Sequence, residues 1–267
     1  MLKDVTLGQY FPGDSFLHRL DPRTKLIAVI LYIVALFQAK SWLAYACVLA
    51  AVALCMAISK IRPKNFFKGL KPMLIIIVLT AFLNIFYTEG TPILPGWIIT
   101  WEGIERAVKM ILRIVLLITG TLLLTYTTSP ISLTDGLELL MAPLKKLKVP
   151  VHEMTMMMSM ALRFIPTLIE ETDKIISAQK ARGADFESGG IVQRAKALVP
   201  VLVPLFVSAF RRADDLAVAM ECRCYHGGEG RTRMKQLKMK PADWLMLVLC
   251  IVFLAAVIGI NKIHFGI

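Results

Sequence analysis

Five long apolar runs constrain this chain more than any other feature of its sequence. An α-helix that crosses the hydrocarbon core of a bilayer needs roughly 17–25 mostly apolar residues, which these runs approach or reach. With 57% apolar residues in a chain of 267, the sequence predicts an all-α, polytopic membrane protein with about five transmembrane helices. The predicted spans are residues 26–39, 42–59, 73–87, 108–126 and 244–260.

Positive charge is distributed unevenly between the segments that join these runs. Residues 60–71, read as a loop, carry five Lys or Arg side chains, and residues 1–25 carry four. The joining segments 40–41 and 88–105 carry one between them. Because Lys and Arg are retained on the cytoplasmic side, we expect the N-terminus inside and the C-terminus outside. All four Trp residues stand at the ends of runs, as interfacial anchors do.

Composition also limits the compartment and the partners. The first 25 residues are polar and mixed, so we expect no cleaved signal peptide. Three of the five cysteines lie inside apolar runs, and Cys222 and Cys224 are too close together for an ordinary disulfide framework, which fits a reducing cytosolic face. The net charge of +12 is spread beside the apolar runs rather than in patches interleaved with aromatic residues. The expected partners are therefore the lipid bilayer and other proteins, with no nucleic acid.

Between residues 129 and 243 the pattern changes from apolar runs to amphipathic helices. Apolar residues at helical spacing from Leu133 to Leu144 predict a short helix, with Ser132 and Asp135 resembling its capping box. Two longer helices follow, from Pro150 to Arg182 and from about Ile191 to Tyr225. The chain is thus expected to divide into residues 1–128, 129–243 and 244–267.

The two longer helices are not expected to cross the membrane. Their apolar stretches contain prolines or charged residues, which a span excludes or confines to its interior. If both crossed, the cations of residues 170–197 would be left outside, against the retention of positive charge in the cytoplasm. We predict helices that lie at or below the cytoplasmic surface, with apolar faces packed on each other and on the inner leaflet.

These two helices end in the same way. Each ends with a small residue, an arginine and another small residue: Ala181-Arg182-Gly183 and Cys222-Arg223-Cys224. An aspartate stands nine positions before each arginine, two and a half turns away, so it faces away from the guanidinium. Each arginine could therefore meet a carboxylate on a partner bidentately. The plainer interpretation stays open, because a cation followed by glycine also caps a helix C-terminus.

The sequence carries no recognisable catalytic, cofactor or metal motif. It lacks the G-x-x-x-x-G-K-[ST] loop, so we expect no ATP hydrolysis by the chain itself. The four histidines are scattered and offer no triad. Cys222, Cys224 and His226 alternate as soft-metal ligands could, but three local ligands leave such a site incomplete.

Several segments together resemble one family: His18-Arg19-Leu20-Asp21-Pro22-Arg23-Thr24-Lys25, Pro143 to Pro150, Ala161-Leu162-Arg163-Phe164-Ile165-Pro166 and the two arginine-bearing helix ends. They are similar to the transmembrane T component of energy-coupling factor transporters, over nearly the whole chain. The resemblance implies a membrane bundle with long cytoplasmic coupling helices, in a prokaryotic cell membrane. In that family the coupling helices end in Ala-Arg-Gly and dock into grooves on two ABC-type ATPase subunits. A separate membrane subunit, the S component, captures a vitamin or metal ion.

The resemblance also implies roles for particular residues. ATPase docking falls on Ala181, Arg182 and Gly183, and on Cys222, Arg223 and Cys224. The second motif departs from the family pattern, since Cys222 and Cys224 replace its Ala and Gly. The small size is kept, but a left-handed backbone suits Cys224 less well than glycine. The chain itself is expected to be non-catalytic and to transmit the motion of the ATPases to the S component.

A methionine cluster is the expected contact for the S component. Thioether side chains repack readily, so such a surface can grip and release apolar partners, although methionines at helical spacing more often pack in a core. The residues expected to make this contact are Met154, Met156, Met157, Met158, Met160, Leu137, Leu140 and Met141.

Two other classes of function remain open at this point. A stand-alone secondary transporter would use ionisable or helix-breaking groups within its spans, for which Asn84, Arg113 and the Gly120 region are the available residues. A membrane-anchored metal sensor would use Cys222, Cys224 and His226.

Overall fold

The computed structural model describes residues 10–91, 100–186, 190–227 and 237–265, and its elements there are helices. The chain forms two compact units. The larger unit consists of Gly8–Leu140 and Gln236–Ile267, and the smaller unit contains Met141–Lys235. Each unit is described by itself.

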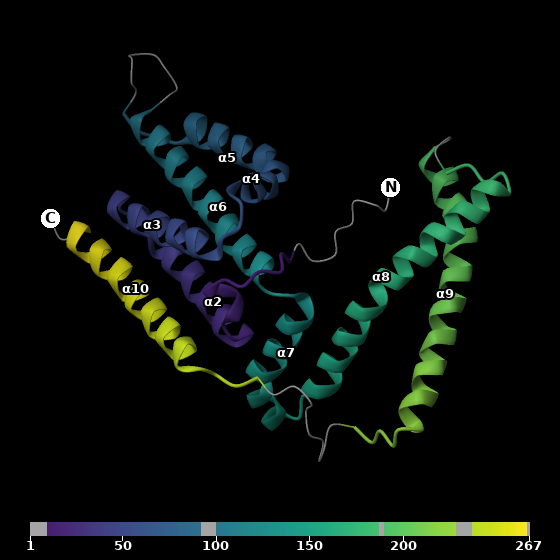
Figure 1. Ribbon diagram of the computed structural model, residues 1–267. Helices are drawn as coiled ribbons and strands as arrows, with labels where there is room; N and C mark the ends of the chain where they lie inside the picture. Colours follow the sequence, from purple (N-terminus) through teal and green to yellow (C-terminus); the bar gives the residue numbers. More distant parts are fainter. Residues whose placement is uncertain (1–9, 92–99, 187–189, 228–236, 266–267) are drawn as a thin grey trace. The chain divides into compact units, whose positions relative to one another are not determined.

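The larger unit holds the apolar helices (Figure 1). Its elements are α1 (Phe16–Arg19), α2 (Pro22–Gln38), α3 (Trp42–Ser59), α4 (Pro63–Leu70), η1 (Lys71–Met73), α5 (Leu74–Tyr87), α6 (Trp101–Thr127), α7 (Pro130–Leu140) and α10 (Pro241–Phe265). The smaller unit holds η2 (Ala142–Leu147), α8 (Val151–Ala181) and α9 (Ile191–Glu221).

Short polar side chains start several of these helices. The Asp21 carboxylate accepts a hydrogen bond from the Arg23 amide at 3.0 Å, and Pro22 opens α2 with its fixed φ. At the start of α7, the Ser129 hydroxyl accepts from the Ser132 amide at 3.3 Å. The prediction that Ser132 caps this helix is therefore wrong, because the helix begins at Pro130 and Ser129 takes the capping position.

Among the described residues, four helices are long and apolar enough to cross a membrane: Trp42–Ser59, Pro63–Tyr87, Trp101–Thr127 and Pro241–Lys262. Neither α8 nor α9 is among them, although each is 31 residues long. The prediction of a loop at 60–71 is wrong for most of its length. Pro63 opens α4 there, and only η1 separates α4 from α5.

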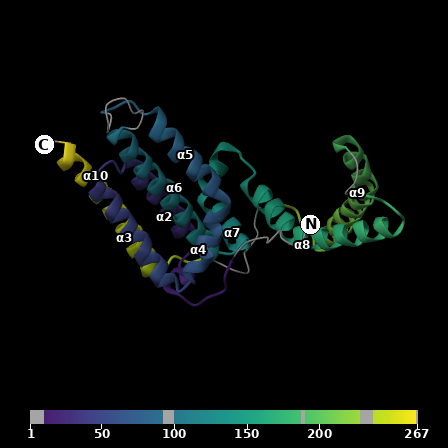
Figure 2. The ribbon, with the colours of Figure 1, turned by 90° about the horizontal axis from the view of Figure 1, so that it is seen from above.

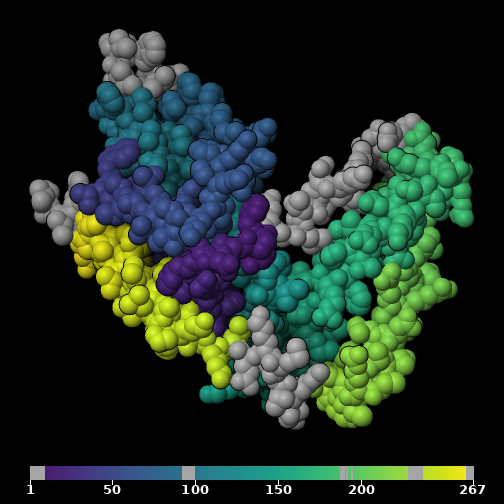
Figure 3. All heavy atoms as spheres, in the orientation of Figure 1, coloured from purple at the N-terminus to yellow at the C-terminus, as the bar shows by residue number. Residues whose placement is uncertain are grey.

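Helix α2, which covers the remaining predicted span, has 17 residues and is about 26 Å long. It lies beside α10 along its whole length, because the Asp21 amide meets Asp243 at one end and the Gln38 carbonyl meets Asn261 at the other. Figure 3 shows the yellow atoms of α10 against purple atoms of the N-terminal part of the chain. Since α2 covers the same thickness as the long apolar helix beside it, we count α2 as the fifth span.

The ends of these helices form two groups. At one end, which we call the base, Tyr126 accepts a backbone hydrogen bond from Phe11 at 3.0 Å and donates its hydroxyl to the Asn65 carbonyl at 3.1 Å. The base thus gathers the cation-rich segments 19–25 and 60–71. The side of the membrane on which the base lies remains a prediction from this charge.

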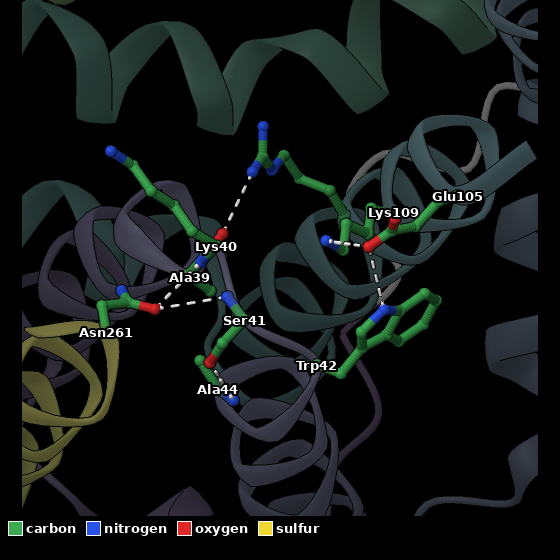
Figure 4. A network of polar contacts seen from close by, with 9 residues as sticks. Ala39, Lys40, Ser41, Trp42, Ala44, Glu105, Lys109 and Asn261 are labelled. Atoms are coloured by element: carbon green, nitrogen blue, oxygen red, sulfur yellow. Dashed lines mark hydrogen bonds and ion pairs between the residues drawn. The ribbon is translucent and has the colours of Figure 1, made fainter. Parts of the chain in front are cut away.

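At the opposite end, which we call the far end, polar contacts close the loop between α2 and α3 (Figure 4). The Asn261 side chain accepts from the Lys40 and Ser41 amides at 3.2 and 3.3 Å. The Trp42 indole donates to Glu105 at 3.1 Å, and Lys109 pairs with the same carboxylate at 2.6 Å. Between the two ends, buried side chains of α2, α3, α6 and α10 form the core, among them Leu36, Val48, Leu116 and Val257.

Candidate functional site

Helices α8 and α9 run antiparallel within the smaller unit (Figures 1 and 2). The Gln179 side chain donates to the Pro200 carbonyl at 3.3 Å, and the Ser208 hydroxyl donates to Glu171. Arg212 donates to the other oxygen of the same carboxylate at 2.7 Å. In these pairs the residue number falls on α8 as it rises on α9, so the two helices are antiparallel and their register is fixed.

The Ser208 hydrogen bond and, after it, the positive charge of Arg212 hold the pKa of Glu171 below its ordinary value. Glu171 therefore stays ionised at neutral pH and can accept both hydrogen bonds. The sequence gives no signal for this tie, because Glu171 is one of several carboxylates on α8 and its partners lie about 40 residues further along the chain.

Helix α8 ends in a Schellman motif, in which two backbone amides just after the helix donate hydrogen bonds to carbonyls of its last turn. The Gly183 amide donates to the Lys180 carbonyl and the Ala184 amide to the Gln179 carbonyl, both at 3.0 Å. Gly183 supplies the left-handed residue that this motif requires, with φ +87°. Arg182 is the residue just before it.

Helix α9 ends in the same motif without a glycine. The Cys224 amide donates to the Glu221 carbonyl at 2.8 Å and the Tyr225 amide to the Met220 carbonyl at 3.1 Å. Cys224 takes the left-handed position with φ +54°, and Arg223 stands just before it. The similarity of the two sequences at 179–184 and 220–225 therefore extends to their backbones, and we call these segments the arginine ends.

The Arg182 and Arg223 side chains are exposed. Within the described part of the chain, the guanidinium groups of Arg182 and Arg223 form no hydrogen bond or ion pair, and Asp173 and Asp214 do not reach them. The guanidinium groups are thus available to a carboxylate on another molecule. The backbone caps are also present, so each arginine lies at a capped helix end and projects from it.

The two arginine ends lie far apart along the hairpin. The register of α8 and α9 places Arg182 beside about residue 197 of α9, which is roughly 26 residues before Arg223. At 1.5 Å per residue the separation along α9 is about 40 Å. Two partner subunits could therefore each bind one arginine end without competing for the same surface.

Three methionines share one exposed face of α8. Met154, Met157 and Met158 are 41%, 59% and 42% exposed, at the i, i+3 and i+4 spacing that places side chains on one side of a helix. We call these three residues the methionine face. Met156 and Met160 are half-buried on other sides of the helix.

The remaining residues expected at this contact lie on the neighbouring elements of the sequence. Leu137 and Leu140 are half-buried on α7 in the larger unit, and Met141 is half-buried in the smaller unit. The buried residues of α7 are Thr134, Gly136 and Glu138, rather than its leucines.

The groups that a stand-alone transporter could use are occupied by contacts within the bundle. The Asn84 amide donates to the Thr80 carbonyl of its own helix at 2.8 Å. Arg113 donates to the Ala39 carbonyl at the end of α2 at 3.2 Å and lies over the Phe37 and Tyr45 rings. Gly120 is buried against the Tyr32 ring.

A cavity of about 170 Å³ lies between α2, α3, α6 and α10. Its walls are almost entirely carbon, from residues such as Ala28, Val52 and Phe253. Two polar groups at its wall already have partners: Lys25 Nζ donates to the Thr127 carbonyl at 3.0 Å, and the Tyr32 hydroxyl donates to the Leu116 carbonyl at 2.7 Å. The cavity therefore offers little polar recognition to a solute.

Cys222, Cys224 and His226 are exposed around the second arginine end. Across the described residues, no group of three or more His, Cys, Asp or Glu side chains is arranged to hold a metal ion. The alternating sequence pattern is thus not accompanied by a convergent ligand set.

Comparison with known proteins decides the family. The model of the family described as "CbiQ: Cobalt transport protein" matches residues 13–234. The chain belongs to the CbiQ family. A protein of Clostridium kluyveri named "Energy-coupling factor transporter transmembrane protein EcfT" is 53% identical over 270 residues, covering 100% of each chain. Proteins with the same name in Ruminiclostridium cellulolyticum and Thermosediminibacter oceani are 52% identical over 267 residues (99% of this chain, 100% of the relative) and 55% identical over 244 (91% and 92%).

Membership of the CbiQ family confirms the resemblance to T components of energy-coupling factor transporters. The all-α, polytopic membrane architecture is also confirmed. The roles of the arginine ends and of the methionine face remain predictions.

Proposed function

We propose that this CbiQ-family protein couples two cytoplasmic ABC-type ATPase subunits to an S component that captures a vitamin or a metal ion. The chain itself is non-catalytic, and the base of its bundle faces the cytoplasm of a prokaryotic cell. The observation that carries the proposal is the pair of arginine ends, with matching backbone geometry and free guanidinium groups about 40 Å apart. The names of the full-length relatives support the same conclusion.

Each arginine end binds one ATPase. Arg182 or Arg223 enters a groove on the ATPase and donates both edges of its guanidinium to a carboxylate, which suits the planar fork of the side chain. Ala181, Gly183, Cys222 and Cys224 are small enough for the groove to approach the helix end closely. Removing an arginine leaves the partner's acid unpaired, which typically costs about 2–5 kcal/mol of binding free energy.

The test is copurification of the ATPases with Arg182→Ala, Arg223→Ala and the double variant. Each single change should weaken binding by roughly 30-fold to several thousand-fold, and the double variant should lose the complex. Lysine at either position keeps the charge but loses the fork, so it should recover only part of the affinity.

Arg211→Ala is the matched control, since Arg211 is an exposed arginine on α9 away from either end. It removes the same charge and should leave binding unchanged. A double variant that assembles like the wild type, once its folded state in the membrane is confirmed, would return both arginines to helix capping alone.

The methionine face binds the S component in this proposal. Its side chains are exposed, flexible and apolar, so they can repack against partners of different shape. A photo-crosslinker at Met157, the most exposed of the three, should trap a second membrane protein. The same crosslinker at Met156, half-buried on another side of α8, should trap it far less. Crosslinks only within the chain at Met157 would remove this part of the proposal.

A further inference from the structure

The segment Met141–Lys235, which holds α8 and α9, joins the larger unit at its two ends, after Leu140 and before Gln236. Within the larger unit, the two adjoining stretches of chain are tied to the same turn of backbone. That turn is Asp21–Lys25, at the start of α2.

The returning stretch is held by Asp243 and Arg23. Asp243 is 2% exposed, and its carboxylate accepts from the Asp21 amide through one oxygen and from the Lys240 amide through the other, both at 2.8 Å. Arg23 donates from Nη2 to the Leu237 carbonyl at 3.3 Å. A buried carboxylate thus joins two segments that are 222 residues apart in the sequence, with both oxygens satisfied.

The outgoing stretch is held by Lys25 and Gly136. Lys25 Nζ donates to the Thr127 carbonyl at 3.0 Å and to the Thr128 hydroxyl at 3.1 Å, at the joint between α6 and α7. Gly136 brings α7 so close to α2 that a Cβ there would lie 2.9 Å from Pro22 Cβ and 3.3 Å from the Arg23 amide nitrogen. The exit of the chain towards the smaller unit is therefore fixed by contacts with the first turn of α2.

We infer that the Asp21–Lys25 turn is the junction through which displacement of the α8–α9 hairpin enters the membrane bundle, with Asp243 and Arg23 as its positioning residues. The inference rests on the proposed coupling function. A pull on either connecting stretch acts on the same turn, and α10, which begins at Pro241, moves with α2 because Asp243 joins their first turns. The junction thus passes the displacement to the α2–α10 pair.

The far end of the same two helices provides a matched control. Asn261 of α10 binds the Gln38 carbonyl and the Lys40 and Ser41 amides, so it also ties α10 to the end of α2. Among the residues that the structure describes, none at that end leads into the smaller unit. Asp243→Asn and Asn261→Asp each keep the size of the side chain. The first replaces an accepting oxygen with a donating NH2 group, and the second makes the reverse replacement. Both weaken the α2–α10 contact, but only Asp243→Asn acts at the junction.

The experiment measures a distance between spin labels in the complex with the two ATPases, in lipid nanodiscs, without nucleotide and after trapping with ATP and vanadate. The labels are attached to a cysteine-free chain at Val248 of α10 and Leu79 of α5, both of which are exposed. The distance between them reports movement of the α2–α10 pair relative to the rest of the bundle. The parent chain and Asn261→Asp should show a nucleotide-dependent shift. Asp243→Asn should assemble with the ATPases but lose the shift. Arg23→Ala removes the tie to Leu237 and the 3.9 Å ion pair of Arg23 with Asp21, and it leaves Asp243 in place. It should reduce the shift, and it serves as the test if Asp243→Asn does not fold.

Three outcomes would overturn the inference. The first is an unchanged shift in Asp243→Asn or, if that variant does not fold, in Arg23→Ala. The second is an equal loss in Asp243→Asn and Asn261→Asp, which would mean that any weakening of the helix pair suffices. The third is no shift in an assembled parent complex. ATPase binding distinguishes these results from failure of the proposed function: a parent chain that does not bind the ATPases overturns both, whereas a bound complex with one of the three outcomes overturns the junction alone.

Discussion

Replacing Cys224 with glycine should stabilise the end of α9. Cys224 holds φ +54° in the left-handed region, which costs a residue with a Cβ about 1–2 kcal/mol. Glycine removes this cost but loses about 0.5–1 kcal/mol of additional backbone entropy on ordering. The Cys224 side chain is exposed, so little packing is lost. The net gain is about 0.5–1 kcal/mol in the free energy of opening the helix end.

Amide hydrogen exchange measures this gain directly. The amides of Cys224 and Tyr225 donate the two hydrogen bonds that close the helix end, so they exchange when the end opens. In Cys224→Gly they should exchange about two- to fivefold more slowly, the factor that corresponds to 0.5–1 kcal/mol. Cys224→Ala keeps the Cβ and removes the thiol, and should leave the rate near that of the parent chain.

The matching change at α8 should act in the opposite direction. Gly183 has φ +87°, and a Cβ there would meet no atom within 4 Å, so Gly183→Cys introduces backbone strain without a steric clash. Exchange at Gly183 and Ala184 should become about two- to fivefold faster. If Cys224→Ala slowed exchange as much as Cys224→Gly, or if Gly183→Cys had no effect, backbone strain would not explain the difference between the two ends.

Three further changes test other parts of the structure. Glu171→Gln should lower stability at pH 7, as measured by thermal melts across pH. The pKa of Glu171 in the folded state lies below its ordinary 4.5, so the stability difference from the parent chain should persist above pH 4.5. The difference should close only as the pH falls through the lowered pKa of the folded state. Gly120→Ala places a methyl group against the Tyr32 ring and should cost about 1–3 kcal/mol in unfolding experiments, with part recovered by Tyr32→Leu. A cysteine at Thr91 should react with an impermeant maleimide in intact cells while the native, exposed Cys222 is shielded, and the reverse pattern would show that the orientation is inverted.

The spans and the arginine ends could be predicted because their determinants are local. An apolar run and its flanking charges lie within one stretch of sequence, and a helix C-terminus is marked by the residues that form it. The two errors, one at α4 and one at α7, are local as well, because Pro63 and Pro130 each open a helix. Proline at the first helical position is a start signal, and it competes with the interpretation of the same stretch as a loop or with a cap placed later.

The long-range ties could not be predicted in the same way. Nothing near Asp243 in the sequence indicates that its carboxylate binds the Asp21 amide, and nothing near Arg113 indicates that it caps α2. Arg113 also shows how an arginine within a span can be structural, since its guanidinium donates to a carbonyl oxygen and lies over two aromatic rings. A charged residue in a span is a reasonable functional candidate until the atoms around it are known.

If the chain couples ATPases to an S component as proposed, the arrangement of polar groups gives that coupling a direction. Within the larger unit, the chain around residues 237–243 is held to the Asp21–Lys25 turn by hydrogen bonds, whereas the middle of the bundle is held by apolar contacts such as those of Leu36, Val48 and Val257. Hydrogen bonds depend strongly on distance and angle, and apolar contacts do so much less. A displacement that arrives at the Asp21–Lys25 turn therefore has to move α2 and α10 together to keep these bonds, while the apolar faces of the neighbouring helices can slide. In this way a rigid polar junction and a compliant apolar interior would convert movement of the hairpin into movement of one helix pair.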